Sequence, residues 1–109
     1  MLAVPWKLEC YLDARGSNPV NQFIESLPVN ERASIRARID FLGEIGNRAR
    51  EPLSKSIGNG LFELRVKSIR IFYCFKPGGV IVLLHGFMKK SQKTPRRELE
   101  IALKRMEEA

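Results

Sequence analysis

Two helices are predicted near the start of the chain from the spacing of its apolar residues. Asn18 is suited to cap a helix, and Pro19 fits the first helical position, where no backbone donor is needed. Apolar residues then recur on one helical face: Val20, Phe23, Ile24 and Leu27. Pro28 ends this helix, and the stripe Ile35, Ile39 and Leu42 predicts a second helix over residues 29–45, which Gly46 closes. Helices joined so closely form a helical hairpin.

Runs of β-branched and aromatic residues predict strands on both sides of this hairpin. The predicted strands span residues 6–12, 61–67, 69–76 and 80–87, with a possible short edge strand at 53–57. Pro77, Gly78 and Gly79 form a turn that makes the last two strands a hairpin. Thr94 and Pro95 begin a C-terminal helix, whose apolar stripe is Leu99, Ala102, Leu103 and Met106.

The element order β-α-α-β-β-β-α predicts an α+β fold in a single domain covering residues 1–109. The N-terminal strand is followed by the helical hairpin, which packs on one face of a three- to four-stranded, mostly antiparallel sheet, and a C-terminal helix ends the chain. In strand 61–67, alternation places Glu63 and Arg65 away from the apolar side, and Arg70 of the next strand also faces away. We therefore expect both arginines on one open, concave face, a rigid setting suited to binding phosphate.

The charge distribution also points to a polyanionic partner. The net charge is +7, and no Asp or Glu occurs between Leu64 and Arg97. That stretch contains nine basic residues: Arg65, Lys67, Arg70, Lys76, Lys89, Lys90, Lys93, Arg96 and Arg97. Nucleic acid is the first candidate partner, and a solvated basic face without a ligand is the alternative.

Cysteine and histidine content argues against a metal centre. Cys10 and Cys74 lie in apolar, strand-like runs, which predicts reduced, buried thiols, with a disulfide or a nucleophile as the alternative. The chain has one histidine, His85, and no cysteine pair at ligand spacing, so no zinc site and no cofactor are expected.

The opening stretch MLAVPWKLECYL does not have the pattern of a signal peptide. Pro5, Lys7 and Glu9 interrupt its apolar residues, so we interpret it as a strand. The sequence contains no apolar run of membrane length, so no membrane partner is expected and the cytoplasm is the predicted location.

Several segments together resemble one toxin family. They are NPVNQFIESLP, GLFELRV, IRIFYCF and VIVLLHGFMKKSQKTPRRELEIALKRM, which cover nearly the whole chain in order. The sequence resembles the HigB-like branch of the RelE/ParE toxin superfamily, including its phage-derived members. The resemblance implies a toxin of a type II toxin–antitoxin module, neutralised by a cognate antitoxin that is usually a helix-turn-helix, HigA-like repressor. HigB- and RelE-type members cut messenger RNA in the ribosomal A site, whereas ParE-type members poison DNA gyrase.

The resemblance also implies roles for individual residues. Arg70 matches the arginine that RelE-type toxins aim at the scissile phosphate, and Arg65 matches a basic position on the preceding strand. Lys89 and Lys90 match a basic pair after the last strand, one member of which contributes to phosphate stabilisation and leaving-group chemistry, and Tyr73 is expected to be structural. Two features depart from the pattern: Leu61 and Glu63 stand where RelE-type enzymes carry lysines, and the last helix lacks their C-terminal Tyr or His. The acid–base assignments of those enzymes therefore do not transfer.

Metal-independent RNA cleavage needs a base, a stabiliser of the phosphorane charge and an acid. Arginine suits the second task, because its planar fork engages two phosphate oxygens. His85 is the candidate base or acid, since its reference pKa of about 6.5 lies near working pH. Alternatively, His85 hydrogen-bonds backbone and orients the Lys89–Lys90 loop. Glu63 as base is a third option, and a salt bridge to Arg65 or Arg70 is its other role.

The remaining candidates would contact RNA. Phe87 could stack on a base or pack in the core, and Lys67, Lys93, Arg96 and Arg97 could bind the RNA backbone. The predicted function is a ribosome-dependent, metal-independent endoribonuclease acting on translated messenger RNA. A ParE-like gyrase inhibitor and an inactive nucleic-acid-binding remnant are the alternatives.

Overall fold

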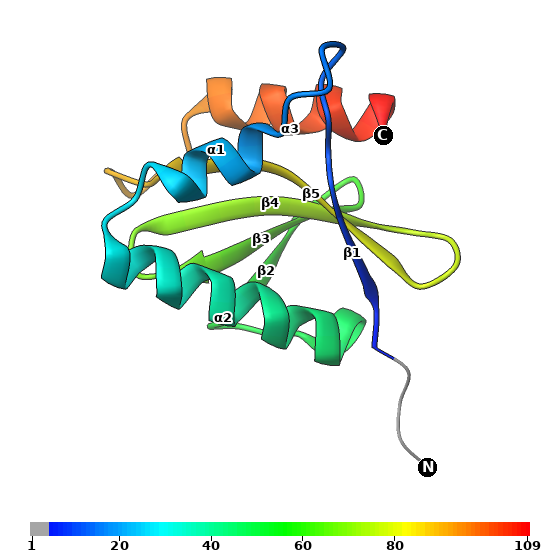
Figure 1. Ribbon diagram of the computed structural model, residues 1–109, viewed down its shortest axis with the longest axis horizontal. Helices are drawn as coiled ribbons and strands as arrows, with labels where there is room; N and C mark the ends of the chain where they lie inside the picture. The colour runs from blue at the N-terminus through cyan, green and yellow to red at the C-terminus, as the bar shows by residue number, and fades with distance from the viewer. Residues whose placement is uncertain (1–4) are drawn as a thin grey trace.

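The computed structural model describes residues 5–109, so residues 1–4 of the predicted opening strand lie outside the described part. The elements are β1 (Lys7–Cys10), α1 (Pro19–Glu25), α2 (Val29–Ile45), the 3-10 turn η1 (Gly46–Arg48), β2 (Ser54–Gly58), β3 (Leu61–Val66), β4 (Ile69–Lys76), β5 (Val80–Met88) and α3 (Arg96–Glu108). They form a five-stranded sheet with α2 and α3 on opposite sides of it (Figure 1). No helix within this part of the chain is long and apolar enough to cross a membrane.

The sheet has the order β1-β5-β4-β3-β2, with β1 parallel to β5 and every other pair antiparallel. The predicted α+β fold is confirmed: the N-terminal strand joins the four strands that follow the helical hairpin in one sheet. β1 is shorter than predicted. After the Tyr11 amide donates to the Leu83 carbonyl at 2.8 Å, the chain leaves the sheet. The Asp13 carboxylate then accepts from the amides of Arg15 and Ser17, both at 2.9 Å, which stabilises a turn in place of a longer strand.

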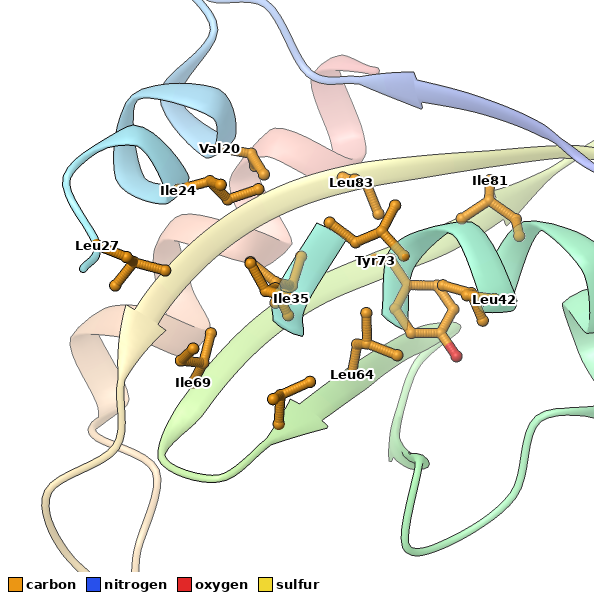
Figure 2. Close-up of a cluster of buried hydrophobic side chains, with 13 residues drawn as sticks. Val20, Ile24, Leu27, Ile35, Leu42, Leu64, Ile69, Tyr73, Ile81 and Leu83 are labelled. Carbon is orange, nitrogen blue, oxygen red and sulfur yellow. The ribbon is translucent and has the colours of Figure 1, made fainter. Parts of the chain in front are cut away.

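The helical hairpin packs on one face of the sheet, as predicted. The Asn18 side chain accepts from the Asn21 amide at 3.0 Å and caps α1, and Pro19 opens the helix. Figure 2 shows the apolar side chains of both helices meeting those of the sheet. The buried residues of this cluster are Val20, Ile24, Leu27, Ile35, Ile39, Leu42, Leu64, Val66, Ile69, Ile71, Tyr73, Ile81 and Leu83. Tyr73 is therefore a core residue, in agreement with the structural role expected for it.

The opposite face is covered by α3, whereas the sequence predicted an open face there. Leu99, Leu103 and Met106 of α3 pack against a second buried cluster. Its buried members are Leu61, Phe72, Cys74, Val82, Leu84, Phe87 and Ala102. Because α3 covers this face, apolar side chains are buried on both sides of the sheet. Without α3, the apolar side chains of this second face would be exposed to water.

A β-bulge in β5 decides which residues face α3. Phe72 pairs with His85 and Tyr73 pairs with Leu83, so Leu84 is an extra residue in the ladder. Val82 and Leu84 belong to the α3-side cluster, and simple alternation from them would place His85 on the opposite face. The bulge reverses the alternation, so His85 and Phe87 face α3 and Gly86 faces the hairpin. A Cβ at Gly86 would lie 2.4 Å from the Phe23 ring, so only glycine fits there.

Both cysteines are free thiols, as predicted, but only Cys74 is buried, whereas Cys10 is half-buried. Cys10 pairs with Leu83 and Cys74 pairs with Val82, adjacent residues of β5 that face opposite sides of the sheet. The two thiols therefore belong to different clusters and form no disulfide. Burial raises the pKa of the Cys74 thiol, which disfavours the reactive thiolate.

Candidate functional site

An open pocket of about 490 Å³ lies at the end of the sheet where β4 begins and β5 ends. Its lining residues are Arg70, Lys89, Lys90, Ser91 and Gln92. The Lys89 amide donates to the Ser68 carbonyl at 2.7 Å, which ties the segment after β5 to the β3–β4 turn. Three cations and two uncharged polar residues line this pocket, and none of its lining residues is acidic. This composition favours an anionic ligand such as phosphate.

Arg70 lies in the wall of this pocket with its guanidinium turned toward the β3–β4 turn. Its Nη1 donates to the Lys67 carbonyl at 2.6 Å and to the Ile69 carbonyl at 3.1 Å. The side chain is 14% exposed, and this burial lowers the pKa of Arg70, while the nearby Glu63 opposes the shift. Arginine nevertheless stays protonated in proteins, so the pocket keeps a partly desolvated positive charge.

Arg65 stands directly opposite Arg70 in the β3–β4 ladder but does not line the pocket. Its Nε donates to Glu63 Oε1 at 3.0 Å, and its Nη1 lies 3.4 Å from Glu51 Oε1. Glu63 is only 1% exposed. Of the two roles considered for Glu63, the salt bridge is the one observed. Its negative charge offsets the repulsion between two arginines that face each other across the strands.

His85 lies outside the pocket, between β5 and α3. Its Nδ1 is 3.3 Å from Arg105 Nη1, and its Nε2 is 2.8 Å from Glu98 Oε1. Because Arg105 has only donors, Nδ1 accepts, and Nε2 carries the proton and donates to Glu98. Burial lowers the pKa of His85, although Glu98 opposes the shift. The neutral ring thus links β5 to α3 and is not a base in the pocket. It hydrogen-bonds two side chains, whereas the alternative considered from the sequence gave it backbone partners.

A neutral, buried His85 makes the free energy of unfolding depend on pH. The unfolded-state pKa is about 6.5 and the folded-state pKa lies lower, so the unfolded chain binds more protons below that pH. We expect full stability above about pH 6.5 and a loss as pH falls through the folded-state pKa. Thermal unfolding on both sides of this pH should give a flatter profile for His85→Gln than for the wild type. Equal profiles would show that other groups cause the pH dependence.

The other predicted RNA contacts are not gathered around the pocket. Phe87 is 4% exposed, with its ring centroid 5.3 Å from that of Phe72, so it packs in the core and is not presented for base stacking. Lys67, Lys93, Arg96 and Arg97 are exposed but are not lining residues. Lys67 contributes its backbone carbonyl to Arg70, and Arg96 forms an exposed ion pair with Glu100.

Of the ten predicted site residues, the pocket therefore brings together Arg70, Lys89 and Lys90. Sequence reasoning missed Ser91 and Gln92, which also line it. The available signal was their position directly after the lysine pair, where the chain leaves the strand and turns toward the next helix. Polar side chains in such a loop supply hydrogen bonds to a ligand bound by the neighbouring cations.

The fold is similar to that of two solved toxin structures. The crystal structure of the toxin–antitoxin complex RelBE2 from Mycobacterium tuberculosis contains a chain that is 17% identical, with a TM-score of 0.58. The alignment covers 79% of this chain and 100% of that one. A free-state mutant of the E. coli toxin RelE, with two arginines replaced by alanine, is 15% identical with a TM-score of 0.64. Here the alignment covers 94% of this chain and 99% of the other. At this identity the likeness shows a shared fold, and the predicted RelE-like fold is confirmed.

Comparison with protein-family models identifies the family of this chain. No curated protein gives a significant match. Residues 22–107, which include the second half of α1, all of α2, the pocket and α3 up to its last residue, match the family model described as phage-derived protein Gp49-like. This agrees with the resemblance to phage-derived members noted from the sequence. The chain belongs to the Gp49-like family of phage-derived proteins, and it has the fold of the RelE toxins.

Proposed function

We propose that this protein is the toxin of a toxin–antitoxin module and cuts messenger RNA on the ribosome. The observation that supports the proposal is the cationic pocket of Arg70, Lys89 and Lys90 at one end of a RelE-like sheet. Inhibition of a protein target does not require cations to converge on one pocket, whereas catalysis at a phosphodiester does.

Cleavage would proceed by attack of the ribose 2′-oxygen on the adjacent phosphorus, without a metal ion. The 2′-oxygen bonds to phosphorus as its proton passes to a solvent water molecule, the phosphorus–5′-oxygen bond breaks, and the 5′-oxygen gains a proton. Arg70 would stabilise the charge on the non-bridging oxygens, because its fork matches two of them. One of the two lysines would protonate the leaving 5′-oxygen, and the other would add positive charge. His85 has no step here, since α3 holds it outside the pocket.

The openness of the pocket explains why the ribosome would be needed. The lining residues include no carboxylate or imidazole, and a pocket this open would leave a bound RNA strand free to adopt many poses. Holding the 2′-oxygen in line with the 5′-oxygen is worth several orders of magnitude in rate. A messenger RNA fixed in the A site supplies this alignment, while the protein supplies the charges.

An antitoxin is the expected second partner. The RelBE2 structure is a complex of a toxin with its antitoxin. We infer that this chain likewise has a cognate antitoxin, of the helix-turn-helix, HigA-like type. Co-expression of the neighbouring open reading frame should abolish any toxicity and yield a complex that copurifies.

The direct test is to map messenger RNA 5′ ends by primer extension after brief induction. Two matched reporters should be compared, one with an intact start codon and one in which that codon is destroyed. We expect new ends inside the translated frame of the first reporter and none in the second. Growth arrest with intact messages would overturn the proposal.

Gyrase inhibition is the second candidate, and the position of His85 favours it. With that ring tied to Glu98 and Arg105, the pocket has no imidazole to move protons. A gyrase poison would leave cleaved DNA in treated cells and would be indifferent to Arg70. A plasmid-cleavage assay with purified gyrase therefore separates the two candidates.

The lysine pair should contribute most to RNA affinity. Each phosphate contact by a lysine adds about 0.7 to the slope of log affinity against log salt for single strands. We expect Lys89→Ala combined with Lys90→Ala to lower this slope by about 1.4 and to weaken binding to any sequence. Lys55→Ala combined with Lys76→Ala is the control, since both are exposed and neither lines the pocket. Equal changes in both double variants would mean that only net charge matters.

A further inference from the structure

Two buried polar atoms beside the pocket lack a hydrogen-bond partner among the described residues: Glu63 Oε2 and Arg70 Nε. They belong to neighbouring strands, and Arg70 Nε lies 3.6 Å from Glu63 Oε1. That separation is too long for a hydrogen bond. A buried carboxylate oxygen and a buried N–H that both remain unpaired are costly to the fold, so their unpaired state needs an explanation.

The β3–β4 turn explains why the two groups stay apart. Lys67 has a φ of 54°, and its carbonyl accepts from Arg70 Nη1, as does the carbonyl of Ile69. The guanidinium is planar and rigid, so the position of Nη1 at the turn also fixes where Nε lies. The bonds to the turn carbonyls thus hold Arg70 in an orientation that leaves its Nε short of Glu63.

A phosphate in the pocket would compete with these carbonyls. Phosphate oxygens are charged acceptors and form stronger hydrogen bonds with a guanidinium than neutral carbonyls do. When Nη1 leaves the turn, a change in the side-chain torsions of Arg70 would let Nε move toward Oε2, the unpaired oxygen of the Glu63 carboxylate. The two unpaired atoms then have partners, and the freed amino groups point toward the phosphate.

We propose that Glu63 is a positioning residue that anchors Arg70 through Nε in a second, phosphate-facing orientation. The inference rests on the proposed phosphate site. Glu63 is itself held in place, because Arg65 donates to its Oε1 at 3.0 Å and Arg65 is in turn paired with Glu51. Buried at 1% exposure, the carboxylate cannot reach the substrate and acts only through the arginines.

This role predicts opposite effects on RNA binding and on cleavage. Glu63→Gln removes a negative charge near the pocket, so RNA should bind with unchanged or higher affinity. The same variant loses the charged anchor of Arg70, and misplacing a catalytic group by about 1 Å slows a reaction by about a hundredfold. We therefore expect single-turnover cleavage of ribosome-bound messenger RNA to fall by about tenfold to a hundredfold. A merely structural role would lower affinity, rate and melting temperature together.

The first experiment follows the arginine Nε–H signals of the full ¹⁵N-labelled chain by NMR, with inorganic phosphate as the probe. The Arg70 signal is assigned by its loss in Arg70→Lys, and Arg65, already bonded to Glu63, serves as an internal reference. We expect phosphate to shift the Arg70 signal downfield in the wild type and to leave it unshifted in Glu63→Gln. An unmoved wild-type signal, or equal shifts in both proteins, would overturn the inference. The wild-type titration alone suffices if the variant does not fold.

The second experiment measures affinity and single-turnover cleavage for the wild type and Glu63→Gln. A slower rate with retained affinity supports the anchor. Parallel loss of both, or no change in either, contradicts it. If the wild type cuts no RNA at all, the proposed nuclease function fails, and the phosphate titration still decides whether Glu63 positions Arg70.

Discussion

Arg70→Ala should reduce messenger RNA cleavage by about a hundredfold to a thousandfold, the usual cost of removing one donor that stabilises a developing oxyanion. Arg70 is the one arginine among the lining residues of the pocket, and its guanidinium is partly desolvated. No lining lysine can reproduce its planar fork. The growth arrest caused by induction should disappear with the cleavage, and the mapped 5′ ends should vanish.

The loss must be separated from unfolding, because Arg70 also bonds the β3–β4 turn. Arg70→Lys keeps the charge without the fork and should give an intermediate rate. Arg15→Ala is the matched control, since it removes the same charge from an exposed position that does not line the pocket. Circular dichroism and thermal unfolding should show a folded Arg70→Ala protein. A folded variant that still cuts at wild-type rates would show that the chemistry is done elsewhere.

Local sequence signals predicted most of the fold. The cap at Asn18, the proline that follows it and the apolar periodicity of both helices fix the hairpin without reference to distant residues. The β4–β5 hairpin follows in the same way from its Pro-Gly-Gly turn. These features are encoded within a few residues of where they act, so sequence alone reveals them.

Features that depend on distant contacts were not predictable. Alternation along β5 gives no sign of the bulge at Leu84, because the extra residue is accommodated by the fit of Gly86 against Phe23 and Ile71. The bulge turns His85 toward α3, where Glu98 and Arg105 hold it. The position of α3 likewise depends on packing across the sheet, and it closes the face that the strand pattern alone left open.

In the candidate site, too, local sequence signals predicted some of the residues, whereas contacts between distant segments determine the others. Arg70 and the lysine pair lie at the adjoining ends of neighbouring strands, so a hairpin prediction is enough to bring them together. Arg65 has the right strand and the right face, yet Glu63 and Glu51 hold it in ion pairs. The burial of each side chain determines whether an arginine lines the pocket or is neutralised by an ion pair. Burial in turn depends on the complete fold.

Gly46→Ala should lower the free energy of unfolding by about 3 kcal/mol, the sum of backbone strain and overpacking. Gly46 ends α2 with a φ of 54°, in a region that L-residues rarely adopt. A Cβ there would also lie 1.8 Å from Nε1 of Trp6, whose ring packs at a tilted angle on Phe75 with the two centroids 5.0 Å apart. The indole would have to leave its place beside the core, which would weaken the packing of the edge strand β1 against the rest of the protein.

Trp6 fluorescence and a control variant separate backbone strain from overpacking as causes of the loss of stability. Trp6 is the single tryptophan of the chain, so its fluorescence should shift to longer wavelength when the ring enters water. Gly16→Ala is the matched control: its φ of 79° imposes similar strain, but nothing lies within 4 Å of the added Cβ. That variant should lose only about 1 kcal/mol and keep the wild-type emission. Equal losses in the two variants would contradict the packing argument, because backbone strain alone would then account for the loss of stability in both.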